Sequence, residues 1–247
     1  MPAPLIAGNW KMNGLAADLE EARTLASALA AAPARARVVL CPPATLTARM
    51  AAVLADSAVA VGGQDCHAEI AGAFTGEVSA EMLADAGARL VIVGHSERRA
   101  GHGESDTAVA AKALAAVRGG LEPIVCVGET LEQRQAGRAL EVVTGQVAGS
   151  VPPALGEAAF AVAYEPVWAI GSGLTPSIAE IEEVHAAIRK ALVAAFAQAG
   201  ARAPILYGGS VKPANAAEIL RAAEVGGALV GGASLKAADF LAIVRAA

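Results

Sequence analysis

The chain of 247 residues is poor in aromatic and charged residues and contains only three cysteines. Aromatic residues make up 3% and charged residues 17% of the chain, whereas 55% of the residues are hydrophobic. A disordered chain would be polar and highly charged, so this composition excludes disorder. No apolar run reaches the ~18 residues of a membrane-spanning helix, and no basic segment precedes an apolar run at the N-terminus. We therefore expect no membrane segment and no secretory signal, and a cytoplasmic location.

The charges and the cysteines exclude two further classes of protein. The formal net charge is −5 and the basic residues are scattered, which argues against a nucleic-acid partner. Cys41, Cys66 and Cys126 are odd in number, far apart and without a Cys-x-x-Cys pair. This pattern favours buried reduced thiols over a redox or metal site, so we expect no metal.

Short apolar runs alternate with amphipathic, alanine-rich segments along the chain. Several runs, such as Leu-Val-Ile-Val at residues 90–93, are apolar at successive positions, which is typical of strands buried on both faces of a parallel sheet. The predicted strands lie at residues 4–11, 38–41, 58–64, 90–95, 123–127, 159–165, 204–209 and 228–232. The predicted helices lie at residues 18–32, 45–55, 105–117, 177–198, 213–223 and 237–245, with stops expected at Gly87, Gly119 and Gly200.

Eight strands that alternate with helices indicate an α/β architecture. Right-handed crossovers leave two main choices, an open doubly wound sheet or a closed eight-stranded barrel. Eight β/α units in ~250 residues match the usual length of the barrel, and no linker divides the chain. We therefore predict one (β/α)8 barrel domain over residues 1–247, a closed parallel sheet ringed by helices.

The polar residues of this apolar chain gather at the ends of the predicted strands. In such a barrel the C-terminal strand ends share one mouth, where active sites form. A cation, an imidazole and a carboxylate therefore converge there. The strand-end residues, in chain order, are Asn9, Lys11, Gln64, His95, Ser96, Glu129 and Glu165.

Three of these residues suggest chemistry, and each has a plainer interpretation. Glu165 is interpreted as a general base, with a structural salt bridge as the alternative. His95 precedes a predicted helix start, whose dipole would favour a neutral ring that donates to an oxyanion; a structural histidine is the alternative. Lys11 is interpreted as neutralising an anion, although enolate stabilisation or a Schiff base also fits.

Glycine-rich turns follow the last two strands. Gly-Gly-Ser at residues 208–210 and Gly-Gly at residues 231–232 each join a strand to a helix, where backbone N–H groups bind phosphate well. The alternative is two tight turns without a ligand. Neither turn matches a nucleotide-binding fingerprint, so a phosphorylated small molecule is the expected ligand.

The segment after Glu165 has the pattern of a lid. Small and rigid residues at both ends suit hinges, and Trp168 and Ile170 give its middle an apolar face. The alternative, an ordinary β/α connection, would be shorter.

Six motifs in order resemble the triosephosphate isomerase family over almost the whole chain. They are Ala-Gly-Asn-Trp-Lys-Met-Asn at residues 7–13, Gly-Ala-Phe-Thr-Gly-Glu at 72–77, Val-Gly-His-Ser-Glu-Arg-Arg at 93–99, Tyr-Glu-Pro-Val-Trp-Ala-Ile-Gly at 164–171, Tyr-Gly-Gly-Ser-Val at 207–211 and Val-Gly-Gly-Ala-Ser-Leu at 230–235. The resemblance implies a TIM barrel of glycolysis and gluconeogenesis that interconverts dihydroxyacetone phosphate and D-glyceraldehyde 3-phosphate through an enediolate, without a cofactor.

The resemblance also implies a role for each site residue. Glu165 would carry the proton, His95 would polarise the carbonyl oxygens, and Lys11 with Asn9 would stabilise the anionic intermediate. The backbone of Gly171, Ser210, Gly231 and Gly232 would hold the phosphate, and Ser96, Glu97 and Cys126 would support the reacting residues. The lid would comprise Pro166, Val167, Trp168, Ala169, Ile170, Gly171, Ser172 and Gly173, with Tyr207 as its contact.

The family pattern further implies a homodimer in which Thr75 reaches the partner's site and Glu77 pairs with Arg98 across the interface. Three positions depart from the commoner pattern: Asp65 stands for asparagine, Ser172 for threonine, and Pro176 lies where the lid often offers an N–H to the tyrosine. Asp65 puts the hydrogen bonding near Lys11 in question. Because proline has no N–H, we expect the closed lid to be held without that bond.

Two rival functions remain from the sequence. An aldolase that forms an imine on Lys11 would leave Glu165 and His95 without a task. A non-catalytic dimeric binding module need not keep all three residues together.

Overall fold

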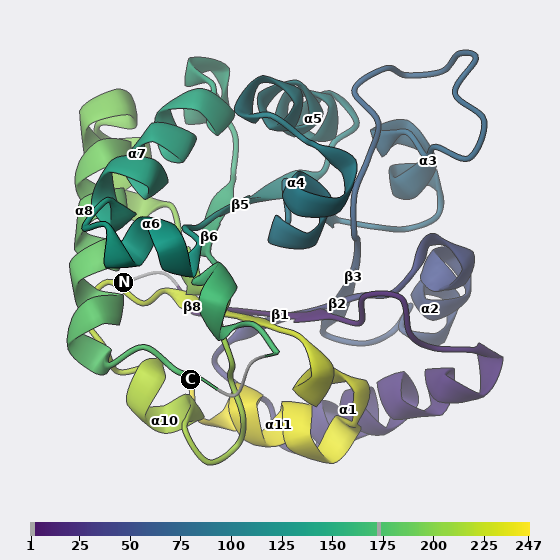
Figure 1. Cartoon of the computed structure of the whole chain (residues 1–247). Helices are drawn as coiled ribbons and strands as arrows, with labels where there is room; N and C mark the ends of the chain where they lie inside the picture. The colour runs from purple at the N-terminus through teal and green to yellow at the C-terminus, as the bar shows by residue number, and fades with distance from the viewer. Residues whose placement is uncertain (1–2, 172–173) are drawn as a thin grey trace.

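The computed structural model describes residues 3–171 and 174–247. Its eight strands form a closed barrel in which all neighbours pair in parallel, and the eighth strand closes the ring against the first (Figure 1). This confirms the predicted barrel, in place of an open sheet. The strands are β1 Leu5–Asn9, β2 Arg37–Cys41, β3 Val59–Gly63, β4 Leu90–Val93, β5 Glu122–Val127, β6 Ala161–Tyr164, β7 Ile205–Tyr207 and β8 Gly227–Val230.

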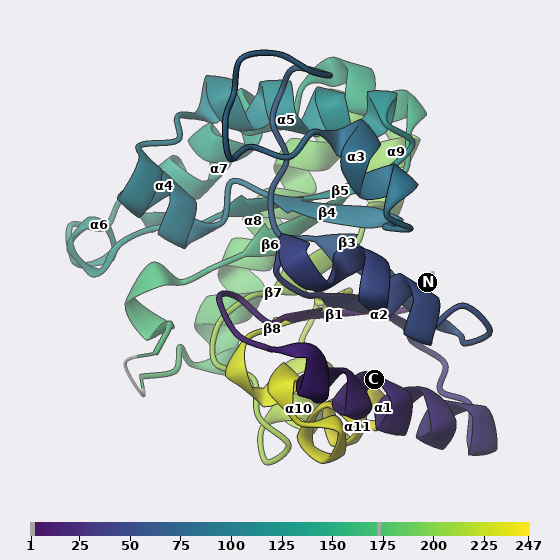
Figure 2. The same ribbon diagram turned by 90° about the vertical axis from the view of Figure 1, so that its right-hand side faces the viewer.

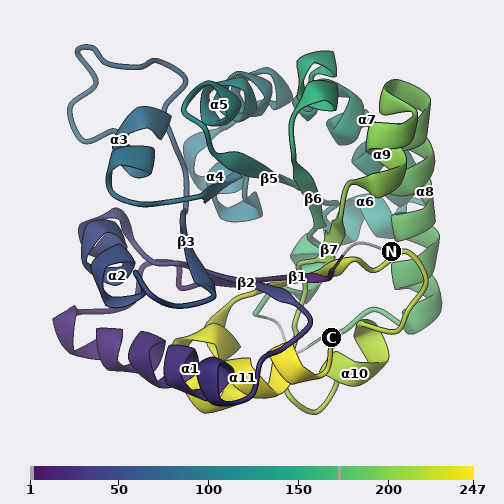
Figure 3. The same ribbon diagram turned by 180° about the vertical axis from the view of Figure 1, so that it is seen from behind.

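Helices form the outer layer around the barrel (Figures 1 and 3). None of the helices among residues 3–171 and 174–247 has the length and apolar character to span a bilayer. The helices are α1 Leu19–Ala31, α2 Thr47–Val53, α3 Ala80–Asp85, α4 Ser96–His102, α5 Asp106–Arg118, α6 Leu131–Gln135, α7 Ala139–Ser150, α8 Ile178–Phe196, α9 Gln198–Arg202, α10 Ala216–Ile219 and α11 Ala237–Arg245.

The core has two layers, which explains why the strands are apolar at successive positions. Leu90 and Ile92 of β4 belong to the cluster inside the barrel, whereas Val91 and Val93 belong to the cluster between strands and helices. Alternate side chains of a strand point to opposite faces, so both sets must be apolar when both faces are covered.

Helices α3, α4, α6 and α7 lie outside the predicted ranges, α9 begins at the last residue of one, and one predicted helix is shorter. Helices α3 and α6 have only six and five residues, which leaves little periodicity to detect. Helix α7 starts without a side-chain cap and includes Gly145 and Gly149, two weak helix formers. Only α10 forms within residues 213–223.

One predicted helix stop is wrong. Helix α8 ends at Phe196, where Ala197 takes a positive φ of 48°, and Gly200 lies inside the following helix α9. Gly200 is needed there for close packing, because a Cβ would collide with the carbonyl oxygen of Leu192. Gly119 does cap α5, and Gly87 has the positive φ expected just after a helix.

Candidate active site

A cavity of about 570 Å³ opens at the C-terminal ends of the strands. Its volume lies in the range usual for small-molecule sites. The two glycine-rich turns contribute to its wall together with strand-end side chains from opposite parts of the sequence. Its walls include Asn9, Lys11, His95, Glu165, Gly171, Gly208, Gly209, Ser210, Gly231 and Gly232.

Lys11 reaches this cavity from an unusual backbone conformation. Its φ is 53°, in the left-handed region, which costs roughly 1–3 kcal/mol for a residue other than glycine. Two contacts offset that cost. The Asn9 side-chain oxygen accepts from the Lys11 N–H at 2.9 Å, and the Gln64 amide donates to the Lys11 carbonyl at 2.8 Å. The strained backbone places the Lys11 side chain on the wall of the cavity. There its ammonium group pairs with the Glu97 carboxylate at 2.6 Å.

His95 stands between the end of β4 and the start of α4. Its Nδ1 accepts from the backbone N–H of Glu97 at 3.2 Å, which places the ring proton on Nε2. Nε2 lies 2.9 Å from Oε1 of Glu165. Burial lowers the pKa of His95, but the Glu165 carboxylate outweighs it and raises the pKa above the ordinary value of 6.5. With Nδ1 accepting, Nε2 carries the proton and donates to Oε1 of Glu165 at the wall of the cavity. The raised pKa runs against the neutral ring that the helix start predicted, because the nearby carboxylate outweighs the dipole.

Glu165 follows β6 and is almost completely buried, with 1% of its surface exposed. The backbone N–H of Ser96 donates to Oε2 at 2.9 Å, and the Ser96 hydroxyl donates to Oε1 at 3.2 Å. Burial raises the pKa of Glu165, but His95, Ser96 and the Cys126 thiol together hold it below the ordinary value of 4.5. The side chain is therefore an ionised carboxylate at neutral pH, as a proton acceptor must be.

The glycine-rich turns present bare backbone to the cavity. At Gly231 the nearest atom to an added Cβ is Lys11 Cε at 3.5 Å, and Gly232 has nothing within 4 Å. At Gly208, by contrast, a Cβ would lie 2.9 Å from Cγ of Glu165. Glycine is thus required at residue 208 for packing, whereas residues 231 and 232 leave room for an approaching anion.

The lid segment is anchored to Glu129 by its tryptophan. Trp168 lies in the short 3₁₀ helix Val167–Ala169, and its indole N–H donates to Oε1 of Glu129 at 3.0 Å. The Arg134 guanidinium lies 5.4 Å from the centre of the indole ring. Of the other predicted lid residues, Ile170 and Gly171 line the cavity, Pro166 and Ala169 lie between them and Glu165, and Ser172 and Gly173 lie outside the described residues.

Glu129 has a role that its position at a strand end did not reveal. It is fully buried and receives hydrogen bonds from Arg134, the Tyr164 hydroxyl and Trp168. It therefore anchors the lid instead of facing the cavity. The sequence showed only that Glu129 follows β5. Position along the chain does not show whether a side chain after a strand points into the cavity or away from it.

Tyr207, the predicted contact of the lid, is buried at the end of β7. Its hydroxyl has no hydrogen-bond partner within the ranges that the structure describes. Burial raises the pKa of this hydroxyl, so it is a neutral donor and acceptor. Such an orphaned buried hydroxyl costs free energy unless another conformation satisfies it.

The predicted interface residues lie on two elements, the loop between β3 and α3 and helix α4. Thr75 and Glu77 are exposed on the loop between β3 and α3, which projects beyond the helices (Figures 1 and 2). Arg98 instead pairs within the chain, with Glu104 at 2.7 Å and Asp65 at 2.9 Å. This corrects the concern about Asp65, because its carboxylate contacts Arg98 and Lys112 and not Lys11.

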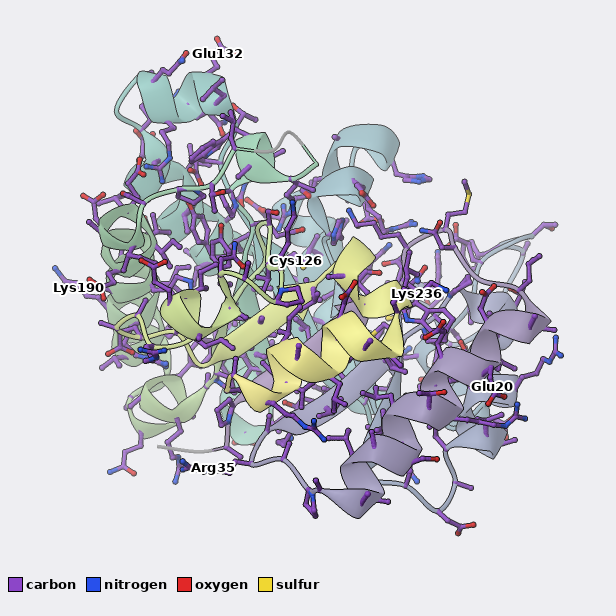
Figure 4. The ribbon with its side chains drawn as sticks, turned by 90° about the horizontal axis from the view of Figure 1, so that it is seen from below. Glu20, Arg35, Cys126, Glu132, Lys190 and Lys236 are labelled. Atoms are coloured by element: carbon purple, nitrogen blue, oxygen red, sulfur yellow. The ribbon has the colours of Figure 1, made fainter. Side chains whose placement is uncertain are left out.

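The three cysteines are buried free thiols, as the sequence predicted. Burial raises the pKa of Cys41 and Cys66 to about 12, and that of Cys126 well above its ordinary value. Figure 4 shows Cys126 towards the middle of the molecule, whereas Lys190 and Glu20 lie at its outside. Among residues 3–171 and 174–247, no three acidic, histidine or cysteine side chains are grouped in a way that would hold a metal ion.

Known proteins resemble this chain in both sequence and structure. The family model for triosephosphate isomerase matches residues 4–247. Triosephosphate isomerase of Caulobacter vibrioides is 62% identical over 245 residues, covering 99% of this chain and 97% of the relative. That of Hyphomonas neptunium is 57% identical, covering 100% and 99%.

A solved structure agrees with these relatives. The crystal structure of triosephosphate isomerase from Bartonella henselae has a TM-score of 0.92 and 46% sequence identity, and the match covers 99% of this chain and 98% of that one. The similarity therefore extends over the entire barrel and includes the strand ends that form the cavity. This chain belongs to the triosephosphate isomerase family, whose members are aldose–ketose isomerases that interconvert dihydroxyacetone phosphate and D-glyceraldehyde 3-phosphate.

Proposed function

We propose that the cavity at the strand ends performs this isomerisation with Glu165 as the base. Its carboxylate takes a proton from C1 of dihydroxyacetone phosphate, and an enediolate forms. The same carboxyl group returns a proton to C2 and a proton passes from O1 to O2, which gives glyceraldehyde 3-phosphate. The observation that carries the proposal is the ionised, buried carboxylate of Glu165, 2.9 Å from the Nε2–H of His95. A base and an oxyanion donor within one small cavity suit proton transfer beside a carbonyl group.

His95, Lys11 and Asn9 stabilise the negative charge that develops. The His95 Nε2–H donates to the carbonyl oxygens in turn, because Nδ1 is already occupied by the Glu97 N–H. The Lys11 ammonium neutralises the enediolate, and Asn9 holds Lys11 in its strained conformation. The ion pair of Lys11 with Glu97 favours this role over imine formation, since an imine needs a neutral amine.

The phosphate is held by backbone N–H groups of Gly171, Ser210, Gly231 and Gly232, all of which line the cavity. Ser96, Glu97 and Cys126 support the reacting residues through hydrogen bonds and an ion pair without taking part in the chemistry. Closure of lid residues 166–173 over the substrate excludes water, which limits loss of phosphate from the enediolate.

The protein acts as a homodimer in the cytoplasm, as one domain and without a cofactor, a membrane or a nucleic-acid partner. Large apolar side chains exposed on the segment after β1 and on the projecting loop with α3 support the dimer, because exposed apolar surface of this kind marks an interface. Met12 is 95% exposed and Leu15 76% exposed, with Ile70, Phe74 and Met82 also exposed. Thr75 and Glu77 are exposed on the projecting loop, where Thr75 reaches the partner's site and Glu77 pairs with Arg98 across the interface.

Sedimentation equilibrium tests the dimer. The purified chain sediments as a dimer, and Thr75→Arg shifts it to monomers by burying a charge in the interface. Thr24→Arg, on the exposed face of α1, is the matched control and leaves the dimer intact. A monomeric wild type would contradict the assembly.

A coupled isomerase assay on glyceraldehyde 3-phosphate tests the reaction. Wild type converts the substrate, and Glu165→Gln loses several orders of magnitude in kcat/KM because the amide cannot accept the proton. An inert wild type, or an unimpaired variant, would refute the proposed mechanism. Borohydride trapping of substrate on Lys11 would instead support an imine-forming aldolase.

A further inference from the structure

Glu165 separates two cavities. One is the substrate cavity at the barrel mouth, and the other is a cavity of about 190 Å³ behind β5 and α4. Among the residues that line both cavities in the described parts of the chain, Glu165 alone is shared. We call the smaller one the rear cavity, lined by Ser96, Arg99, Ala100, Thr130, Gln133 and Gln146 beside Glu165.

The rear cavity leads from solvent to the carboxylate. Ala100 and Thr130 on its wall are exposed, whereas Glu165 at its inner end is almost completely buried. Between them lies the hydroxyl of Ser96, which donates to Oε1 of Glu165 at 3.2 Å. The path therefore begins in bulk water and ends on the atom that would carry the substrate's proton.

Several polar groups on the wall of the rear cavity are fixed in position, although apolar atoms form most of its surface. The Gln146 amide accepts from the Gly128 N–H at 2.7 Å and donates to the Gly128 carbonyl at 3.1 Å. The Arg99 guanidinium is held by the carbonyls of Gly94 and Cys126. A roomy cavity with several polar groups is the kind that holds ordered water, each molecule of which occupies about 30 Å³ in the liquid.

We propose that the rear cavity holds a chain of water through which the proton on Glu165 exchanges with solvent while the substrate cavity is closed. The proposal rests on the role of Glu165 as the base. A closed lid keeps water from the substrate side, so exchange of the abstracted proton needs a second route. The rear cavity supplies that route on the other side of the carboxylate.

The exchange leaves atoms and charge unchanged. Protonated Glu165 gives its proton to the Ser96 oxygen or to the nearest water, and the Ser96 hydroxyl proton passes to the next water. A solvent proton returns to the carboxylate along the same chain. The enediolate then receives the solvent proton at C1 or C2 in place of the one that was removed.

Isomerisation of dihydroxyacetone phosphate in D₂O tests this route. Proton NMR gives the ratio of product that retains hydrogen at C2 to product that carries deuterium there. Ala100→Leu and Ala100→Met place a long apolar side chain in the rear cavity from an exposed helical position, where folding tolerates it. Ala186→Leu, at an exposed position of α8, is the matched control.

Both Ala100 variants reduce the exchanged fraction relative to the retained fraction by about threefold or more, because proton transfer needs an unbroken chain of hydrogen bonds. The control keeps the wild-type ratio. Because the two products divide from one intermediate, the ratio does not depend on the overall rate. If both Ala100 variants still isomerise the substrate and keep the wild-type ratio, the proposal is overturned. Full activity of Glu165→Gln would instead refute the role of Glu165, so the two failures are distinguishable.

Discussion

At the scale of single residues, each polar group of the site owes its state to a neighbour from another strand end. Glu165 stays ionised although buried, because His95 and Ser96 stabilise its negative charge. Lys11 keeps a strained backbone because Asn9 and Gln64 hold it from both sides. Buried charges are expensive unless paired, so these groups function as a set.

Replacing Glu165 by glutamine lowers the pKa of His95. The Glu165 carboxylate is the main group that raises that pKa against burial, so without it burial prevails over the smaller effect of Glu97, which still raises the pKa. An NMR titration of the His95 ring in both proteins measures the change. Glu132→Gln, which removes an outer carboxylate (Figure 4), leaves the His95 titration unchanged. An equal or higher pKa of His95 in Glu165→Gln would contradict the coupling.

At the scale of elements, the lid is a short segment between two fixed ends. Strand β6 holds its start, and a capping box holds the start of α8, where Ser177 accepts from the Glu180 N–H and the Glu180 carboxylate accepts from the Ser177 N–H. The middle is anchored through Trp168 to Glu129. Closure of the proposed lid therefore requires that the hydrogen bond from Trp168 to Glu129 breaks. Any further contacts that hold the lid over the substrate form only in the closed state.

Tyr207→Phe retains kcat/KM within about threefold and does not lower the melting temperature, because the hydroxyl that it removes has no hydrogen-bond partner among residues 3–171 and 174–247. With Pro176 in place of a residue that has an N–H, the closed lid has no bond to lose at that position. The isomerase assay and thermal unfolding check both parts.

Tyr164→Phe is the comparison, since these are the two tyrosines of the chain. The Tyr164 hydroxyl donates to Glu129 at 3.1 Å and accepts from Arg134 at 3.1 Å. Its removal leaves buried partners unsatisfied and destabilises the fold by about 1–3 kcal/mol.

The Tyr207 prediction is contradicted if Tyr207→Phe abolishes closure of the lid, as judged from the structure with a bound substrate analogue. The Tyr207 hydroxyl would then be needed in the closed lid.

At the scale of the whole molecule, the barrel depends on the apolar layer between its strands and helices, where a charged side chain would be costly. His185 on α8 lies in this layer, fully buried, with its ring edge-on to Tyr164 at 5.8 Å. Its Nδ1 bonds to the Glu224 carbonyl at 3.2 Å, and its Nε2 has no partner within the described ranges. Burial lowers the pKa of His185 to about 4.

The fold should lose stability in acid through His185. The folded ring has a pKa of about 4 and the unfolded one about 6.5, so the unfolded chain binds the extra proton between these values. The contribution of His185 to the free energy of unfolding is fully present above pH 6.5. It is lost as the pH falls towards 4, and the total loss is roughly 3 kcal/mol.

Urea unfolding at several pH values measures this loss. His185→Asn keeps a side-chain N–H for the Glu224 carbonyl but has no proton to gain, so its stability depends less on pH in this range. The comparison uses the slope with pH and not the absolute stability, since the substitution also alters packing. Equal slopes in the two proteins would show that His185 does not carry the effect.

The sequence by itself determined the parts of this protein that depend on neighbours along the chain. Successive apolar residues such as Leu90 and Val91 predicted strands covered on both faces, and the helix predicted from residue 177 agrees with the start of α8. Strand ends predicted that Asn9, Lys11, His95 and Glu165 would share the mouth, because parallel strands bring their C-terminal ends to one side. Glu129, also at a strand end, turns away from it. The pattern was weakest for short helices such as α3, where few residues express a period.

Only the tertiary structure decided how those residues meet. Ser96 and Glu165 are 69 positions apart in sequence, and their bond depends on how β4 and β6 are placed around the ring. The turn of Glu129 towards Trp168, the pairing of Asp65 with Lys112 and the rear cavity have the same origin. A local pattern specifies which side chains a strand end carries, but distances between strand ends are set by closure of the barrel and packing of its two layers.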